Sequence, residues 1–422
     1  MMISILTHPG WRGVMCASLA LAAFDSQSVA ANGLSALKKI QEVHARLKAV
    51  EFTSDHNLLH EDGSDLRFAG DRLADVEWES TRGRQVARLT HTAARNLEAR
   101  ALVSLNFLPA GTTVRVVGES EDGHFCLNGS SKITFGGVGP CMAVVPLTAK
   151  KLMPASLSIL QGEVHWQAEI SIPGENTTSV ELNATTYLEC YLTRGTPRTE
   201  KAASEVTAMR LRESYRRLEY ATSHLGADAS IVAIVHALTS HCGRYYNPQQ
   251  HFERQDAWYV PNTWRYRYPG ASCISICNYC SLILDQIGME GEYKQLEIYA
   301  RPDNPTKAIE GGVTSEDYVK DVDWQRWQLF LVDDRSTRWG QVGSYGGMNN
   351  YEACIAYTWQ GKTYYFPGGT DRVYDHLDQV LCVFRTLVWA RWDPRRNNWQ
   401  VMEVVHTYNQ PGHGVPGNCK IP

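Results

Sequence analysis

The sequence predicts an α+β protein in which a β-sandwich-like region is followed by a mixed region of helices and strands. Between about residues 65 and 193, short alternating or apolar runs are separated by turn signals such as Asp122-Gly123 and Pro173-Gly174. Many short strands with regular turns are typical of a β-domain. Beyond residue 204, longer helical periodicities come first and strand-like runs come after, which indicates a second, α+β part.

The length of 422 residues is too great for one ordinary core, so we expect more than one domain. Composition shifts divide the chain into four predicted segments. These are a signal peptide (1–31), a β-rich domain (32–194), a linker with a helix (195–228) and an α+β domain (229–422).

Periodicity also predicts the individual elements. Apolar residues spaced three to four apart predict helices at 33–49, 204–224 and 229–241. Strands are expected at 113–117, 164–170, 186–192, 292–300, 326–332, 351–358 and 362–366. A final helix or strand pair is expected at about 377–392 and 399–407.

The N-terminus has the pattern of a secretory signal peptide. Arg12 precedes an apolar run at 13–24, and the small residues of Ser28-Val29-Ala30-Ala31 fit a cleavage site. The apolar run is too short to span a bilayer, and no later stretch reaches that length. We therefore expect a secreted or periplasmic protein without a membrane span.

Charge and composition exclude some partners. The net charge of -4 and the absence of a basic run argue against nucleic acid. The acidic residues Asp321, Asp323, Asp333 and Asp334 lack the alternating register of a calcium loop, so a solvated surface is expected. The sequence predicts no metal and no cofactor.

Export makes disulfides chemically possible, and ten cysteines remain after the predicted cleavage. Cys126 and Cys141 bracket a glycine-rich turn region and are a candidate bridge, while Cys419 could staple the tail. The pair Cys277-x-x-Cys280 has no second CxxC, which argues against a zinc ribbon.

A buried helix is predicted to open at Cys273. Residues 273, 277, 280, 284 and 287 share one helical face, Ser272 can cap the start, and Gly288 can stop the helix. The helix N-terminus lowers the pKa of a thiol in the first turn, which makes Cys273 a candidate nucleophile. The alternative is that Cys273 is another core or disulfide-bonded cysteine.

This helix resembles the nucleophile helix of the transglutaminase-like superfamily, which shares the papain-type cysteine fold. Cys273 opens it, Cys277 and Cys280 occupy the small and apolar places that follow, and Ile287-Gly288-Met289 precedes a strand at 292–299. The resemblance implies a second strand bearing a histidine, matched by 350–357, and a third bearing an aspartate, matched by 362–369.

The sequence departs from the family pattern at the residue that would act as the catalytic base. Glu352 stands where the histidine is expected, and Asp371 lies just beyond the place of the acid. An ionised carboxylate beside Cys273 would raise the thiol pKa, so Glu352 is a poor substitute for the base. The histidines that could replace it are His241, His376 and His406.

Two functions follow from the resemblance. The first is an exported cysteine-dependent amidase or acyltransferase acting on protein or peptide, with Cys273, Glu352 and Asp371 as catalytic residues. In a variant of it, Glu352 is a base and Tyr351 or a neighbouring tyrosine is the acid. The second is a transglutaminase-like domain without catalysis, which binds a polypeptide or glycan. Its expected binding residues are the aromatics Trp258, Trp264 and Tyr351. The missing histidine favours the second.

Overall fold

The computed structural model describes residues 43–408. Gaps in this range fall at 57, 60–72, 74–75, 82–85, 107–108, 135–140, 199–204, 227–228, 244–271 and 333–347. The chain divides into two units between His44 and Ala45. The signal peptide predicted at 1–31 lies outside the described residues.

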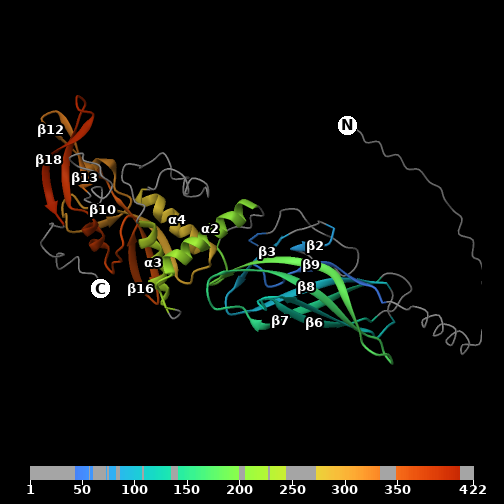
Figure 1. Ribbon diagram of the computed structural model, residues 1–422. Coiled ribbons are helices and arrows are strands. Elements are labelled where there is room, and N and C mark those ends of the chain that lie inside the picture. Colours follow the sequence, from blue (N-terminus) through green and yellow to red (C-terminus); the bar gives the residue numbers. More distant parts are fainter. Residues whose placement is uncertain are drawn as a thin grey trace, which may run out of the picture. The chain divides into compact units, whose positions relative to one another are not determined.

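The first part of the larger unit is one nine-stranded sheet (Figure 1). Its hydrogen-bonded order is β2-β1-β4-β7-β6-β5-β8-β9-β3. All neighbouring strands are antiparallel except β3 and β9. The strands are β1 (Ala45–Glu51), β2 (Trp78–Glu79), β3 (Val86–Thr92), β4 (Asn96–Leu105), β5 (Thr113–Ser120), β6 (Cys126–Lys132), β7 (Cys141–Leu152), β8 (Ile159–Ser171) and β9 (Thr178–Thr193).

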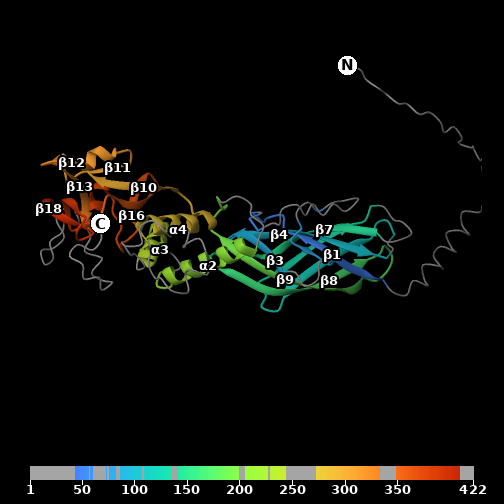
Figure 2. The same cartoon turned by 90° about the horizontal axis from the view of Figure 1, so that it is seen from above.

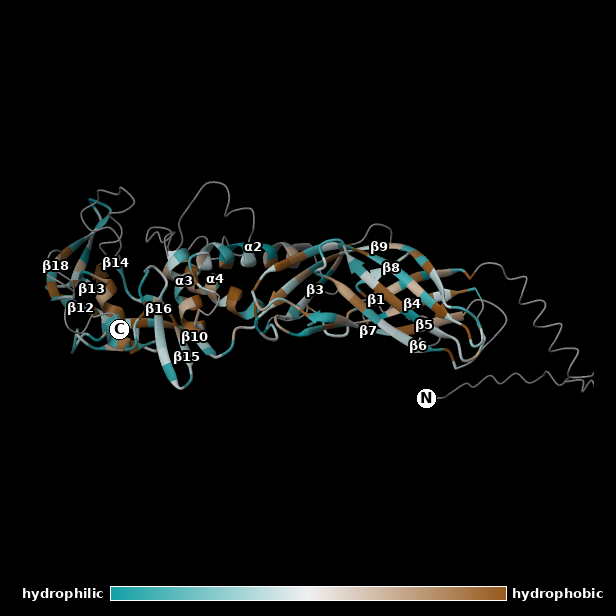
Figure 3. Ribbon diagram, turned by 60° about the horizontal axis from the view of Figure 1, so that its bottom comes forward, coloured by the Kyte–Doolittle hydropathy of each residue, from teal (hydrophilic) through white to brown (hydrophobic). Residues whose placement is uncertain are grey.

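This sheet is nearly closed, because β1 and β9 contact each other although five strands lie between them in hydrogen-bonded order. Alternate residues along β8, among them Val164, Trp166 and Ala168, are buried. Figure 3 shows the same alternation of apolar and polar residues on several strands. A side chain at Gly118 would lie 2.5 Å from the ring of Trp166, so glycine there makes room for the tryptophan.

The helix predicted at 33–49 is wrong where the structure describes it. Residues Ala45–Glu51 form strand β1, which pairs with β4, while 33–42 lie outside the described residues. Ala45, Leu47 and Ala49 alternate with Arg46 and Lys48, so the segment fits a period of two as well as a helical period. Pairing with β4 selects the strand.

A buried carboxylate links the large sheet to the first helix of the next part, α2 (Glu205–Thr222). Glu189 of β9 is 2% exposed and accepts hydrogen bonds from Gln161 Nε2 at 3.0 Å and from the Tyr191 hydroxyl. It also pairs with Arg212 Nη2 of α2 at 2.5 Å. The buried charge is thus held by several donors, as a charge removed from water requires.

We expect Glu189→Ala to lower the free energy of unfolding by about 2 kcal/mol. The variant removes the buried acceptor of the hydrogen bonds from Gln161, Tyr191 and Arg212. Urea unfolding of the full chain measures this change. Glu181→Ala is the matched control, since Glu181 is an exposed glutamate on the same strand. Equal losses in the two variants would contradict the expectation.

The second part contains helices α2, α3 (Ile231–Gly243) and α4 (Cys273–Gln286), followed by strands. The first two helices confirm the predictions at 204–224 and 229–241. A four-stranded sheet has the order β11-β10-β15-β16, and its strands are β10 (Glu292–Ala300), β11 (Ala308–Glu310), β15 (Glu352–Trp359) and β16 (Lys362–Pro367). Figures 1 and 2 show α3 and α4 beside this sheet, and α4 contacts both β15 and β10.

A five-stranded sheet has the order β12-β13-β17-β18, with β14 paired to β13. Its strands are β12 (Val319–Val322), β13 (Gln325–Val332), β14 (Met348–Asn349), β17 (Thr386–Asp393) and β18 (Asn398–Thr407). Two short 3-10 helices, η2 (Ser315–Tyr318) and η4 (Leu377–Val383), precede β12 and β17. The element expected at 377–392 is therefore η4 followed by a strand.

Strand β15 lies between two hydrophobic cores. Ala353, Ile355 and Tyr357 join a core with α2, α3 and α4, whereas Cys354 and Ala356 join a core with η4 and β17. Burial on both faces explains why this strand is almost continuously apolar.

The described chain is thus a mixed α+β protein with most of its regular structure in strands. Within the described residues, none of the helices combines the length and apolar character needed to cross a membrane.

Candidate functional site

Local signals define helix α4 at both ends. Ser272 caps the start, and its Oγ accepts the backbone N–H of Ser275 at 3.4 Å. Gly288 follows the helix with φ +58°, and a side chain there would lie 2.3 Å from the carbonyl oxygen of Gly195. Both the positive φ and the close backbone require glycine. The predicted cap and stop are confirmed.

The predicted buried face of α4 is also confirmed. Cys273, Cys277, Cys280, Leu284 and Ile287 are all 0% exposed. They pack into the core that contains α2, α3 and one face of β15. The face that carries the candidate nucleophile is therefore the core face of the helix.

Cys273 lies where α4 meets the start of β15. Its Sγ accepts a hydrogen bond from the backbone N–H of Ala353 at 3.4 Å. Its own backbone is covered by Gly368, because a side chain at Gly368 would lie 2.2 Å from the Cys273 carbonyl oxygen. Strand and loop together enclose the first turn of the helix.

Glu352 is the first residue of β15 and is 0% exposed. Its Oε1 accepts the backbone N–H of Gly369 at 3.3 Å, and Gly368 N–H donates to the Ala353 carbonyl at 2.9 Å. The antiparallel pair β15–β16 thus brings Glu352 and the Gly368-Gly369 step to the helix start. The three sequence segments singled out by the resemblance meet at this point.

Neighbouring thiols are held protonated at neutral pH. Burial raises the pKa of Cys277 well above its usual range, and the nearby Cys354, Cys273 and Glu352 raise it further. Burial and the adjacent Glu352 likewise raise the pKa of Cys354. These cysteines are inert core thiols.

Among the contacts of the described residues, none joins the Asp371 side chain to Cys273 or Glu352. Asp371 is exposed, and its backbone carbonyl accepts a hydrogen bond from His236 Nε2 at 2.8 Å. Asp371 is therefore placed as a loop residue that anchors α3 through its main chain.

The three histidines considered as replacement bases have neighbours elsewhere. His241 of α3 lies 3.5 Å from Arg217 Nη1 and stacks on Tyr220 with ring centroids 6.5 Å apart. His376 is exposed at the start of η4, and His406 packs edge-on against Tyr408 at 4.7 Å.

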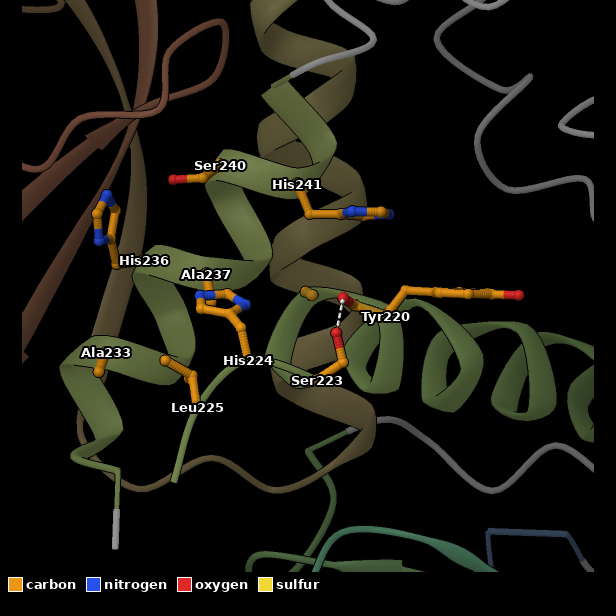
Figure 4. A pocket seen from close by; sticks show the side chains of 10 residues that line it. Tyr220, Ser223, His224, Leu225, Ala233, His236, Ala237, Ser240 and His241 are labelled. Atoms are coloured by element: carbon orange, nitrogen blue, oxygen red, sulfur yellow. Dashed lines mark hydrogen bonds between the residues drawn. The ribbon is translucent and has the colours of Figure 1, made fainter. Parts of the chain in front are cut away.

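Sequence reasoning singled out His241, but not the two histidines that share a cavity with it. His224, His236 and His241 line a cavity of about 440 Å³ beside α2 and α3. Figure 4 shows His236 and His241 on opposite sides of α3, which matches their spacing of five residues. In the part of the chain that the structure describes, no three His, Cys, Asp or Glu side chains are placed to hold a metal ion.

Among the predicted binding residues, Tyr351 is described and half-buried. Its ring lies 5.5 Å from that of Tyr299, and burial together with the nearby Cys273 and Glu297 raises its pKa. A phenol with a raised pKa gives up its proton less readily, which weighs against the acid role. Trp258 and Trp264 lie outside the described residues.

The candidate bridge between Cys126 and Cys141 is wrong, since both thiols are free. Leu127 pairs with Ala149, so the antiparallel register places Cys126 near Lys150, whereas Cys141 is at the opposite end of β7. Nine residues of extended strand separate two such positions by about 30 Å. Cys419 lies outside the described residues.

The solvated surface predicted for the four acidic residues at 321–334 agrees with the two of them that the structure describes. Asp321 and Asp323 are both exposed, while Asp333 and Asp334 lie outside the described residues.

Comparison with known proteins finds no matching family model and no matching curated protein. Among solved structures, one similar chain is a family 123 glycoside hydrolase from Clostridium perfringens, studied for glycolipid glycan hydrolysis. It shares 8% identity over 37% of this chain, with a TM-score of 0.16. The chain spans 28% of that protein's length, and the likeness is too slight to carry a fold or an activity over.

Proposed function

We propose that this is an exported protein with a transglutaminase-like domain that has lost cysteine catalysis and binds a polypeptide or glycan. In this proposal a β-sandwich-like domain (32–194) and a linker with a helix (195–228) precede the transglutaminase-like domain (229–422). Export rests on the signal-peptide pattern at 1–31.

The arrangement around Cys273 supports the transglutaminase-like assignment. A cysteine opens a buried helix, and the antiparallel strands β15 and β16 present their facing ends to it. Glu352 lies at the start of β15, in the place that the resemblance gives to a histidine. The resemblance therefore rests on one geometric feature, the meeting of a helix N-terminus with the ends of two strands.

The observation that carries the loss of catalysis is the fully buried pair of Cys273 and Glu352, both 0% exposed. A cysteine nucleophile must form a thiolate and meet a substrate carbonyl. A neighbouring carboxylate disfavours the thiolate, and complete burial keeps a substrate carbonyl away from the sulfur. With the Ala353 N–H bound to the sulfur, the site is built as a packed junction.

Alkylation by iodoacetamide tests this proposal. In the native protein at neutral pH we expect Cys273 to stay unlabelled while half-exposed Cys126 is labelled, as measured by mass spectrometry of the digested chain. In the urea-unfolded protein both should be labelled. Cys126 is the internal control for reagent and time.

Labelling of native Cys273 as fast as Cys126 would overturn the non-catalytic assignment. It would mean that the thiol is accessible and ionised, which are the two properties of a nucleophile. The cysteine-dependent amidase or acyltransferase would then be the better function.

A further inference from the structure

A second cavity, of about 550 Å³, lies at the edge of the five-stranded sheet. It is lined by residues from β10, η2, β12, β13, β17 and β18. Neither Cys273 nor Glu352 is among the lining residues. Its lining mixes aromatic rings with neutral amide and hydroxyl groups and one guanidinium.

Strand register explains the aromatic part of this lining. Trp327 pairs with Arg391, which places Arg326 beside Trp392, and Trp392 pairs with Trp399 of β18. Arg326, Trp392 and Trp399 therefore form a row across three strands on one face of the sheet. The two indole rings lie 5.5 Å apart at 69°, and Trp392 is 42% exposed. Trp392 thus keeps exposed aromatic surface beside a charged donor.

The polar part of the lining is incompletely hydrogen-bonded. Among the described residues, the Tyr318 hydroxyl and Asn350 Oδ1 are buried atoms without a hydrogen-bond partner. Tyr318 is only 5% exposed, yet both residues line the cavity. A buried polar atom without a partner is costly, and a ligand hydroxyl entering the cavity would supply one.

This combination fits a saccharide. A pyranose ring has an apolar C–H face, which packs on an aromatic ring, and a rim of hydroxyls, which are both donors and acceptors. Arg326 donates, Asn350 Oδ1 accepts, and the Tyr318 hydroxyl does both. A nucleotide would need more positive charge, and a fully apolar ligand would leave the polar atoms unsatisfied.

We propose that this cavity, with Trp392 as its stacking platform and Tyr318 and Asn350 as its hydroxyl partners, binds an oligosaccharide. This inference names the ligand class of the binding function proposed above. It rests on that proposed function, in which the ligand is bound without being cleaved. A polypeptide is the competing ligand, because β12 lies at the edge of its sheet and could accept a further strand.

Isothermal titration calorimetry of the full chain tests the proposal with chitotetraose, cellotetraose and maltotetraose as probes. We expect at least one to bind, and Trp392→Ala to weaken its binding about tenfold or more, because the stacking face is lost. Trp324→Ala is the matched control. Trp324 is a fully exposed tryptophan at the turn between β12 and β13, outside the cavity.

Tyr318→Phe separates binding from folding. It removes only a hydroxyl without a partner among the described residues, so the unliganded protein should keep or raise its thermal midpoint while saccharide binding weakens about tenfold. A role in folding alone would leave affinity unchanged and would overturn the proposal.

Three further outcomes would overturn it. In the first, none of the three saccharide probes binds. In the second, Trp324→Ala weakens saccharide binding as much as Trp392→Ala, and in the third, an unstructured peptide binds in the cavity whereas the saccharides do not. The proposed function fails separately. Labelled Cys273 with intact saccharide binding would refute the loss of catalysis alone, whereas unlabelled Cys273 without saccharide binding would refute this site alone.

Discussion

Gly368→Ala is expected to lower the free energy of unfolding by about 3 kcal/mol or more. A Cβ there would lie 2.2 Å from the carbonyl oxygen of Cys273 and 2.9 Å from its Cα. These are backbone atoms of a capped helix, so neither side can move without disturbing α4 or the pairing of β15 with β16. The midpoint of urea unfolding, followed by circular dichroism, measures the loss.

Gly361→Ala is the control for this variant. Gly361 connects β15 to β16 with φ +78°, and a side chain there would meet nothing within 4 Å. Only the backbone strain remains, at about 1 kcal/mol. If Gly368→Ala cost no more than Gly361→Ala, the loop would not be packed on the helix start as the structure shows.

The second large effect is expected at Glu352. Glu352→Ala should lower the free energy of unfolding by about 3 kcal/mol, since it opens a cavity in a fully buried place and takes the acceptor from the Gly369 N–H. Glu352→Gln keeps the shape and an acceptor oxygen, so its loss should stay near 1 kcal/mol. The same unfolding measurement compares the two variants.

The pair of Glu352 variants also addresses the role of the carboxyl group. A structural acceptor predicts a small loss for glutamine and a large loss for alanine. A loss for glutamine as large as the loss for alanine would show that the negative charge itself is needed, and would reopen a chemical role for Glu352 beside Cys273.

Much of the fold is predictable from local sequence. The helix at Cys273 starts at a serine cap and stops before a glycine with positive φ, and both signals act within a few residues of the helix ends. The strands expected at 292–300 and 362–366 were likewise bounded by short turns and agree with β10 and β16 within one residue.

Where local patterns were ambiguous, long-range contacts chose the outcome. Residues 45–49 fit either a helix or a strand, and pairing with β4 made them a strand. Cys126 and Cys141 are close in sequence, but the register of β6 on β7 places them far apart. Neither result could follow from spacing along the chain.

The candidate sites show the same division. By itself, the sequence determined that Cys273 opens a buried helix. It also showed a glutamate at the place where the proposed resemblance calls for a histidine. Only the tertiary structure decided that Glu352 and Gly368 lie at the start of that helix, and that Tyr318, Asn350 and Trp392 line one cavity. The reason is physical: caps, turns and periodicity act over a few residues, whereas burial and side-chain convergence depend on strand register and packing between distant segments.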